Sequence, residues 1–307
     1  MEVANIECKE NFDISSMTTF KVGGTVKKMY FPTNQQEFVL LLKELKNPIV
    51  LGNCSNVIFS SQGYDGAIIS TLKMEYIEVR GTHIFAECGV KGPFASQTAY
   101  NSSLSGFEFM IGFPGTIGGN VYMNAGAHGQ NISDTFVKAC LYDTKKKEIV
   151  YIEKENMEFG YRHSILQDGR YILIGAEFAL KKSNKDEIKN LMDRNLEFRK
   201  NIQPSLATPN AGSVFKNPEN DSAGRLLDKA GVKELCSDNV QVWSKHANFI
   251  VNTGNATSQD ILELIFKMYS TVKDTYTIEL EPEIKFIGKK NKREEEICKL
   301  LYKKTQK

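Results

Sequence analysis

Apolar and polar residues alternate differently in successive zones of the chain, and this pattern predicts its helices and strands. In the first zone, short β-branched and aromatic runs predict strands at residues 28–32, 48–52, 56–60 and 66–70. An apolar stripe at helical spacing predicts a helix over 35–45. The first zone is therefore expected to form a small α/β unit that ends near residue 70.

The second zone, roughly 71–200, is mostly strand and ends in a helix. Alternating or β-branched stretches predict strands at 76–81, 83–89, 136–143, 148–153 and 171–180. A charged amphipathic helix is expected over 186–200, and the Pro, Asn, Thr and Gly residues of 201–212 indicate a linker. We therefore expect three domains, at 1–70, 71–204 and 205–307.

The third zone carries a clear helix signal. Thr257 and Asp260 have the spacing of an acidic capping box. The apolar residues behind them share one helical face that is expected to be core: Ile261, Leu264, Ile265, Met268 and Val272. In the basic tail that follows, Ile297, Leu300 and Leu301 predict a short surface helix, and three consecutive glutamates argue against a nucleic-acid arm.

Composition excludes several classes of protein. The chain has 307 residues, 41% of them hydrophobic, and a formal net charge of +2, so it is expected to be globular with no general attraction to nucleic acid. No apolar run approaches the roughly 18 residues that span a bilayer, and the polar N-terminus is not expected to act as a signal peptide or an anchor. The six cysteines stand far apart without a C-x-x-C motif, which favours reduced thiols over disulfides or a metal site and indicates a cytoplasmic protein.

Two segments are candidates for binding a ligand through the backbone. LGNCSN (51–56) follows a predicted strand, and its N–H groups could converge on a diphosphate, although an ordinary turn fits equally well. In GFPGTIGGNVYMNAGAHGQN (112–131), six of twenty residues are glycine, which lets main chain lie against a flat ligand. Tight internal packing is the alternative. Neither segment matches the G-x-G-x-x-G or P-loop patterns.

Collinear motifs give the chain a family resemblance. TTFKVGG (18–24), LGNCSN, the glycine segment, YRHS (161–164), AGSVFKNP (211–218), AGRLLDKAG (223–231), KHANFIVN (245–252) and LEPEIKF (280–286) follow one another in this order. Together they resemble the UDP-N-acetylenolpyruvoylglucosamine reductase family, whose members are also called UDP-N-acetylmuramate dehydrogenases. The likeness covers most of the chain. About fifty residues separate YRHS from GSVFKNP, which resembles the shorter family type without an inserted substrate-covering loop.

The resemblance implies an α+β fold and a reaction. The fold would be a two-part FAD-binding module of the vanillyl-alcohol-oxidase (PCMH) type, followed by a C-terminal α/β substrate-binding domain. NADPH would reduce FAD, and hydride would pass from flavin N5 to C3 of the enolpyruvyl group of a UDP-sugar. The implied setting is the bacterial cytoplasm, with a nucleotide sugar and NADPH as small-molecule partners, no membrane insertion, and a monomer or weak oligomer.

The resemblance also implies roles for individual residues. Arg162 would stabilise the developing enolate, Glu283 would act with it as a proton donor whose pKa is raised by desolvation, and Ser213 would protonate C2. The implied substrate contacts are Tyr161, Lys216, Asn217 and His246, of which His246 could equally be a satisfied core histidine. The implied FAD contacts are Gly52, Asn53, Cys54, Ser55, Asn56, Gly112, Gly115, Thr116, Ile117, Gly118 and Gly119.

Two positions depart from the family pattern. The segment LGNCSN (51–56) is called the diphosphate loop below, and in it Cys54 replaces the second glycine of the family pattern. Ile202 stands where some relatives have a lysine. The closest rival function is another FAD-dependent oxidoreductase of the same superfamily, acting on a small alcohol or sugar. A second rival is a nucleotide-sugar binding protein without activity, but the presence of Arg162, Ser213 and Glu283 argues against it.

Overall fold

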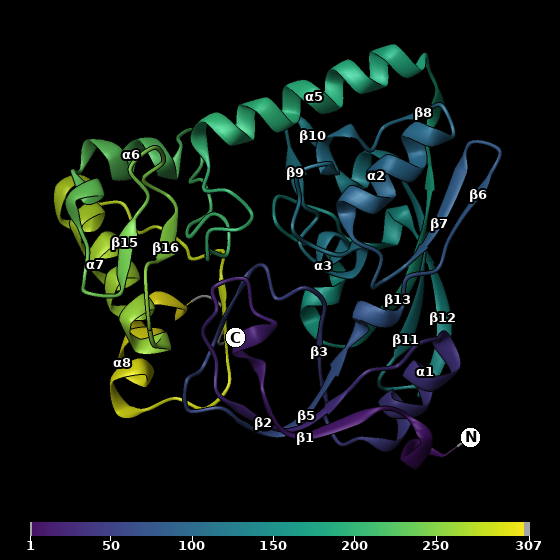
Figure 1. The fold of residues 1–307 in the computed structure, drawn as a ribbon, viewed down its shortest axis with the longest axis horizontal. Helices are drawn as coiled ribbons and strands as arrows, with labels where there is room; N and C mark the ends of the chain where they lie inside the picture. The colour runs from purple at the N-terminus through teal and green to yellow at the C-terminus, as the bar shows by residue number, and fades with distance from the viewer. Residues whose placement is uncertain (1, 304–307) are drawn as a thin grey trace. The chain divides into compact units, whose positions relative to one another are not determined.

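The computed structural model describes residues 2–303, and these residues form two compact units (Figure 1). The first unit is built from chain segments within 1–10, 28–53 and 66–199, and the second from 11–27, 54–65 and the residues from 200 onward. Each unit therefore collects segments that are distant in sequence. The predicted boundary at residue 70 between two FAD-binding subdomains stays a prediction.

The N-terminal strands form a four-stranded sheet with the order β1–β2–β5–β3. Its members are β1 (Cys8–Asp13), β2 (Thr25–Tyr30), β5 (Tyr64–Ser70) and β3 (Ile49–Leu51), of which β3 and β5 pair in parallel. Helix α1 (Gln35–Glu44) is capped by Asn34, whose side chain accepts the N–H of Glu37, and it buries Phe38 and Leu41. The strands and the helix predicted for this zone are confirmed.

The second sheet has five antiparallel strands in the order β12–β11–β13–β7–β6. In the core of the first unit, the ring of Phe178 packs edge-on against those of Phe107 and Phe136, with centroids 5.2 and 5.7 Å apart. All five strands were predicted: β6 (Ile77–Arg80), β7 (His83–Glu87), β11 (Phe136–Asp143), β12 (Glu148–Glu153) and β13 (Tyr171–Ala179).

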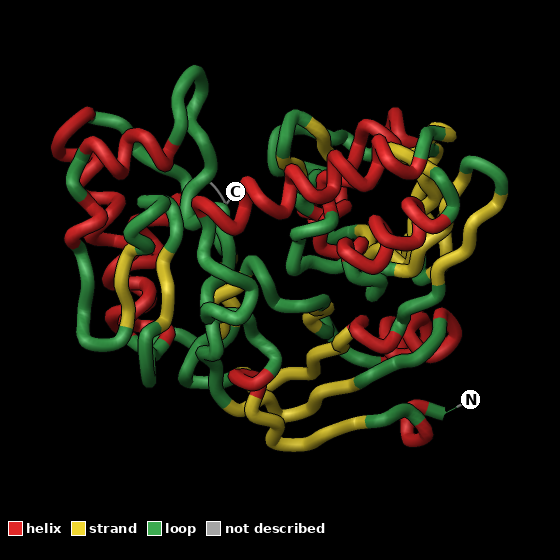
Figure 2. Tube along the Cα trace, turned by 45° about the horizontal axis from the view of Figure 1, so that its top comes forward, coloured by secondary structure: helices red, strands yellow, loops and turns green. Residues whose placement is uncertain are grey.

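Shorter elements complete the first unit. Helix α3 (Ile117–Tyr122) lies against β13 and β7. Figures 1 and 2 show α5 (Lys185–Ile202), the predicted charged helix, as one unbroken helix. The remaining elements are α2 (Gly92–Asn101), β8 (Leu104–Ser105), β9 (Gly126–Ala127), β10 (Gln130–Asn131), α4 (Ile132–Thr135) and β14 (Lys181–Lys182).

Within the part of the chain that the structure describes, the second unit contains two strand pairs and three α-helices. Strand β4 (Val57–Phe59) pairs in parallel with β17 (Lys285–Ile287), and β15 (Val240–Val242) pairs with β16 (Ile250–Asn252). The helices are α6 (Ala223–Lys229), α7 (Ser258–Tyr276) and α8 (Lys292–Leu301).

Helices α7 and α8 confirm two predictions for this unit. The capping box of Thr257 and Asp260 is present, and all five residues of the predicted apolar face are buried. In the predicted surface helix α8, Ile297 and Leu301 are buried while Leu300 is 44% exposed. The α+β fold class expected from the sequence is confirmed.

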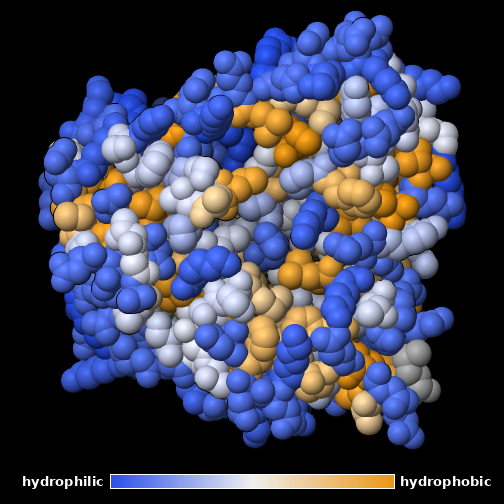
Figure 3. All heavy atoms as spheres, in the orientation of Figure 1, coloured by the Kyte–Doolittle hydropathy of each residue, from blue (hydrophilic) through white to orange (hydrophobic). Residues whose placement is uncertain are grey.

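Polar and charged residues cover most of the face of the molecule seen in Figure 3, with apolar residues in scattered patches. Within residues 2–303, no helix is both long and apolar enough to cross a membrane. The same residues contain no cluster of three or more His, Cys, Asp or Glu side chains that could hold a metal ion. The six cysteines all lie within the described residues, and none of them forms a disulfide.

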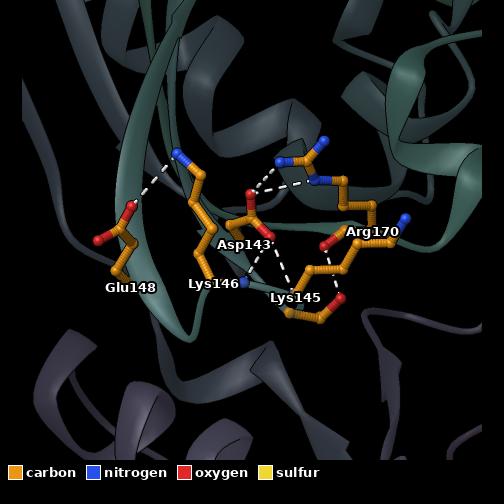
Figure 4. Close-up of polar contacts among 6 residues, drawn as sticks. Asp143, Lys145, Lys146, Glu148 and Arg170 are labelled. Carbon is orange, nitrogen blue, oxygen red and sulfur yellow. Dashed lines mark hydrogen bonds and ion pairs between the residues drawn. The ribbon is translucent and has the colours of Figure 1, made fainter.

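A buried carboxylate fixes the turn between β11 and β12 (Figure 4). Asp143 accepts two hydrogen bonds from Arg170, at 3.0 and 2.7 Å, and the backbone N–H groups of Lys145 and Lys146 at 2.9 and 3.1 Å. Its side chain is only 1% exposed. The bonds from Arg170, followed by those from the backbone, lower the pKa of Asp143 to about 2.

We expect Asp143→Asn to lower the Tm at neutral pH, and the difference from the wild type to disappear in acid. The folded pKa of about 2 lies below the usual value of 3.8, so the ionised group stabilises the fold above about pH 4. That contribution is lost as the pH falls from about 4 to 2. Thermal unfolding of both proteins across this range tests the expectation, and a Tm difference that does not change with pH would contradict it.

Candidate functional site

Two segments predicted to bind the cofactor meet in the first unit. A Cβ at Gly52, just after β3, would lie 2.4 Å from Oγ1 of Thr116, so a side chain there would displace the hydroxyl. The side-chain amide of Asn53 donates to the carbonyl of Pro114 at 2.6 Å. The start of the diphosphate loop (51–56) and the start of the glycine segment (112–131) are therefore in direct contact.

The hydroxyl of Thr116 is an unsatisfied polar group at this contact. Its Oγ1 is buried, and it has no hydrogen-bond partner within residues 2–303. Such groups are uncommon in folded proteins and require an explanation. A ligand oxygen beside Gly52 would supply the missing partner, so these residues fit the diphosphate of FAD.

Two glycines of the glycine segment serve internal packing. Gly118 donates its N–H to the carbonyl of Cys88 at 2.8 Å, and a Cβ on it would lie 3.0 Å from that oxygen. A Cβ on Gly112 would lie 2.5 Å from Cδ of Arg199. At these two positions the packing interpretation of the glycine segment is supported.

Gly119 differs, because a Cβ there would meet no atom within 4 Å. This open side leaves room for a ligand against the main chain of α3. The neighbouring Ile117 is fully buried and donates its N–H to the carbonyl of Val90, while the carbonyl of Gly115 accepts the N–H of Gly92. Of this group, Thr116 has an unsatisfied hydroxyl and Gly119 an open side, whereas Gly115 and Ile117 hold the segment in place.

Cys54 lies in the left-handed region of the backbone map, with φ at 49°. That conformation favours glycine, the residue that the family resemblance leads one to expect at this position. The side chain is buried, and burial raises the pKa of the thiol to about 12, so Cys54 stays neutral and unreactive. Ser55 beside it is half-buried, and Asn56 donates its side-chain amide to the carbonyl of Glu283 at 3.3 Å.

Arg162 lies at the tip of a tight turn in the first unit. Gly160 and His163 exchange two backbone hydrogen bonds of 3.2 Å, and Arg162 between them has a φ of 55°. The exposed ring of Tyr161 lies 5.1 Å from the Arg162 guanidinium carbon. Asn124, from the glycine segment, donates to the carbonyl of Gly160 at 3.0 Å and so ties the two motifs together.

Two side chains that the sequence did not single out anchor this turn to α3. Ser164 and Gln167 donate to the carbonyl of Tyr122 at 2.9 and 3.0 Å. Gln167 also donates to the carbonyl of Arg162 at 2.9 Å. Arg162 is thereby held to the last residue of the helix that carries Gly118 and Gly119.

Ser213 and Glu283 lie on neighbouring segments of the second unit. The N–H of Glu283 donates to the carbonyl of Val214 at 2.8 Å, and that of Lys216 donates to the carbonyl of Glu281 at 2.9 Å. The structure therefore brings together two of the three predicted catalytic residues within one unit.

Asn248 positions the Ser213 segment and was not predicted. Its backbone carbonyl accepts the N–H of Val214, and its buried side-chain amide bonds both the N–H and the carbonyl of Phe215, at 2.9 and 2.8 Å. The Asn248 side chain thus satisfies the backbone N–H and carbonyl of Phe215, as a neighbouring strand would do in a sheet. The KHANFIVN motif contained this residue, but nothing in the sequence indicated which backbone groups it would meet.

The predicted substrate residues of this unit have mixed surroundings. Lys216 forms an ion pair of 2.7 Å with Glu281, and the side-chain oxygen of Asn217 accepts the N–H of Ala223 at 3.0 Å, next to the start of α6. Burial, followed by the charge of Lys233, lowers the pKa of His246. His246 is therefore neutral at pH 7.

Contacts of the His246 ring favour a satisfied, partly buried histidine. Its Nδ1 accepts the N–H of Asn248 at 3.2 Å, and the ring packs edge-on against Phe249 at 4.9 Å. Since Nδ1 is the acceptor, the ring proton lies on Nε2. A substrate contact for His246 stays a prediction.

Two family models match the chain. One is described as an FAD binding domain and matches residues 26–144. The other, described as the C-terminal domain of UDP-N-acetylenolpyruvoylglucosamine reductase, matches residues 203–287. The first range includes the diphosphate loop and the glycine segment, and the second includes Ser213 and Glu283.

Similar proteins cover nearly the whole chain. The UDP-N-acetylenolpyruvoylglucosamine reductase of Caldicellulosiruptor saccharolyticus is 39% identical over 294 residues, which is 94% of each chain. The enzyme of the same name from Lactobacillus acidophilus is 39% identical over 290 residues, covering 93% of this chain and 97% of the relative. The crystal structure of the UDP-N-acetylenolpyruvylglucosamine reductase from Thermus caldophilus superposes with a TM-score of 0.79 at 29% identity, over 92% of this chain and 98% of that one.

Proposed function

Since this chain belongs to the UDP-N-acetylenolpyruvoylglucosamine reductase family, we propose that it reduces the enolpyruvyl group of UDP-N-acetylglucosamine enolpyruvate to yield UDP-N-acetylmuramate. It is an FAD-dependent oxidoreductase of peptidoglycan precursor synthesis, and NADPH is its reductant. The observation that carries the proposal is the 39% identity over 94% of the chain. Because its substrates are nucleotides, we place its activity in the bacterial cytoplasm.

The residues that would hold FAD are those at the contact between the diphosphate loop and the glycine segment. Gly119 leaves room beside the main chain, and the hydroxyl of Thr116, which packs against Gly52, lacks a partner within residues 2–303. When bound, FAD would supply the two-electron redox chemistry that links oxidation of NADPH to reduction of the enolpyruvyl group. The protein's task is then to stabilise negative charge and to deliver a proton.

Arg162 and Glu283 are proposed to stabilise the negative charge that spreads into the substrate carboxylate. A fixed cation stabilises developing charge without reorganising during the reaction, and the turn of Arg162 is fixed by Asn124 and Gln167. Glu283 helps an anion only as a neutral proton donor, so its pKa is predicted to be raised. Finding Glu283 ionised throughout the active pH range would contradict that role.

Ser213 is proposed to deliver the proton to C2. A hydroxyl is a weak acid, but the carbanion-like C2 is a strong base, and a neutral donor does not compete for the anion. The segment that carries Ser213 is held by the side chain of Asn248 and by its pairing with the Glu283 segment. These bonds are what keeps a short hydroxyl side chain at a constant position.

We expect Gly119→Ala to weaken FAD binding by about 10-fold while the Tm of the apoprotein stays unchanged or rises. The added methyl group meets no protein atom and improves helix propensity, but it occupies the open side that the cofactor would use. The matched control is Gly118→Ala, whose methyl group would lie 3.0 Å from the carbonyl of Cys88 and should lower the Tm instead. FAD titration and thermal unfolding check both, and unchanged FAD affinity in Gly119→Ala would remove Gly119 from the site.

The proposed function is tested by following the visible absorption of the purified protein without oxygen. We expect a flavin spectrum that bleaches on addition of NADPH and returns only on addition of UDP-N-acetylglucosamine enolpyruvate. A colourless protein that takes up no added FAD would refute the proposal. A flavin that bleaches but reoxidises only with oxygen would favour the related oxidoreductase that acts on an alcohol or sugar.

A further inference from the structure

Arg199, near the end of α5, lies against the glycine segment. Its Cδ and Nε would be 2.5 and 2.7 Å from a Cβ on Gly112, so the side chain runs directly over that main chain. Its guanidinium carbon lies 6.0 Å from the centre of the Phe113 ring. Only glycine at position 112 permits this approach.

The guanidinium of Arg199 has no counter-ion in the part of the chain that the structure describes. No hydrogen bond or ion pair joins it to any of residues 2–303, whereas Arg170 and Arg293 each make two bonds to one carboxylate. Arg199 is also half-buried, and burial lowers its pKa. Burial, followed by the positive charge of Arg199, lowers the pKa of the neighbouring His128. A histidine carries no negative charge, so His128 is not a counter-ion for Arg199.

An arginine that is partly removed from water without an anionic partner is unfavourable in the free protein. Such a position is stabilised when a ligand brings the missing charge. Guanidinium offers a planar fork of donors that suits two oxygens of one phosphate. Each of the three nucleotides in the proposed function, FAD, NADPH and the UDP-sugar, carries phosphate.

We propose that Arg199 binds a phosphate group of one nucleotide ligand of this enzyme. The inference rests on the proposed function for the identity of the nucleotides, and on the contacts of Arg199 for the position of the cation. The glycine segment would then have a second use, because Gly112 leaves the space through which the arginine stem reaches this position.

The test compares Arg199→Met with Arg199→Lys and with Arg194→Met. Methionine keeps an apolar stem without the charge, lysine keeps the charge without the fork, and Arg194 is an exposed arginine on the same helix. Three constants are measured for each protein: the Kd of FAD for the apoprotein, the KM of NADPH for flavin reduction, and the Kd of UDP-N-acetylglucosamine enolpyruvate for the oxidised enzyme.

For Arg199→Met we expect one of the three constants to weaken by about 10- to 100-fold, as for a lost charged hydrogen bond, with a smaller loss in Arg199→Lys and none in Arg194→Met. The constant that changes identifies the phosphate. Removing an unpaired charge should leave the Tm of the apoprotein unchanged or raised. If all three constants of Arg199→Met stay within about 2-fold of the wild type and its Tm is lower, Arg199 only packs on Gly112 and the proposal is wrong.

Failure of this inference is distinguishable from failure of the proposed function. If the wild-type protein takes up FAD, is reduced by NADPH and is reoxidised by the substrate, the proposed function stands whatever Arg199→Met does. If the wild-type protein does none of these, the fault lies in the proposed function.

Discussion

Ser213→Ala is expected to slow reoxidation of the flavin by the enolpyruvyl substrate by about 10²- to 10⁴-fold, the range typical of a lost general acid. Flavin reduction by NADPH should remain within a few-fold of the wild type, because no proton from Ser213 enters that step. Stopped-flow absorbance without oxygen measures the two half-reactions separately. The backbone bonds that hold this segment, from Asn248 and Glu283, do not involve the hydroxyl, so the fold should be preserved.

The control for this variant is Ser237→Ala, which removes an exposed hydroxyl in the same unit. Both half-reactions should keep their wild-type rates in this protein. If Ser213→Ala instead loses both half-reactions together, Ser213 has a structural role and the proton has another source.

The second large effect is expected for Arg162→Met, which should slow enolpyruvyl reduction by about 10²- to 10³-fold. The loss arises because the charge that builds up on the substrate carboxylate would face an apolar side chain. Arg162→Lys should recover part of the rate, since it restores the charge without the planar fork. Both variants keep an unbranched side chain at φ 55°, so the turn between Gly160 and His163 should persist.

Single-turnover reoxidation of the prereduced enzyme, with saturating substrate, isolates the step in which Arg162 is proposed to act. Flavin reduction by NADPH and the Tm serve as internal controls for each variant. An Arg162→Met enzyme that reduces the substrate within about 3-fold of the wild-type rate would exclude Arg162 from charge stabilisation.

Much of the fold could be predicted from hydrophobic periodicity, and the exceptions have physical causes. Strand β1 was missed because nearly all of its side chains are exposed, which leaves no apolar alternation. Helix α2 was missed because Gly, Pro and Ala give little helical pattern, although its small residues Ala95 and Ala99 are buried. The predicted strand β4 exists, but it pairs with β17, more than two hundred residues away, and no local pattern indicates such a partner.

The candidate site residues were proposed from motifs, and no pattern in the sequence indicated the bonds that position them. Glycine and serine at fixed places in a motif indicate a chemistry. The structure brings Gly52 against Thr116 in the first unit and the segments of Ser213 and Glu283 together in the second. Side-chain amides such as those of Asn248 and Gln167 bind backbone groups that are close only after folding. The contact between Gly112 and Arg199 likewise joins two elements that the sequence gives no reason to place together.

The second unit is assembled from segments that are distant in sequence, which affects how the protein folds during synthesis and whether fragments of it can fold. Phe20, Val22 and Ile58 belong to the same core as residues near the C-terminus, such as Ile265 and Ile297. During synthesis on the ribosome, these early apolar residues must therefore wait for the last third of the chain before they can be covered. A fragment ending near residue 200 would expose them to solvent and to aggregation, and a fragment beginning there would lack the strand β4 that pairs with β17. We therefore expect that neither half folds when it is produced alone by truncation. The two halves would have to be co-expressed to form the second unit.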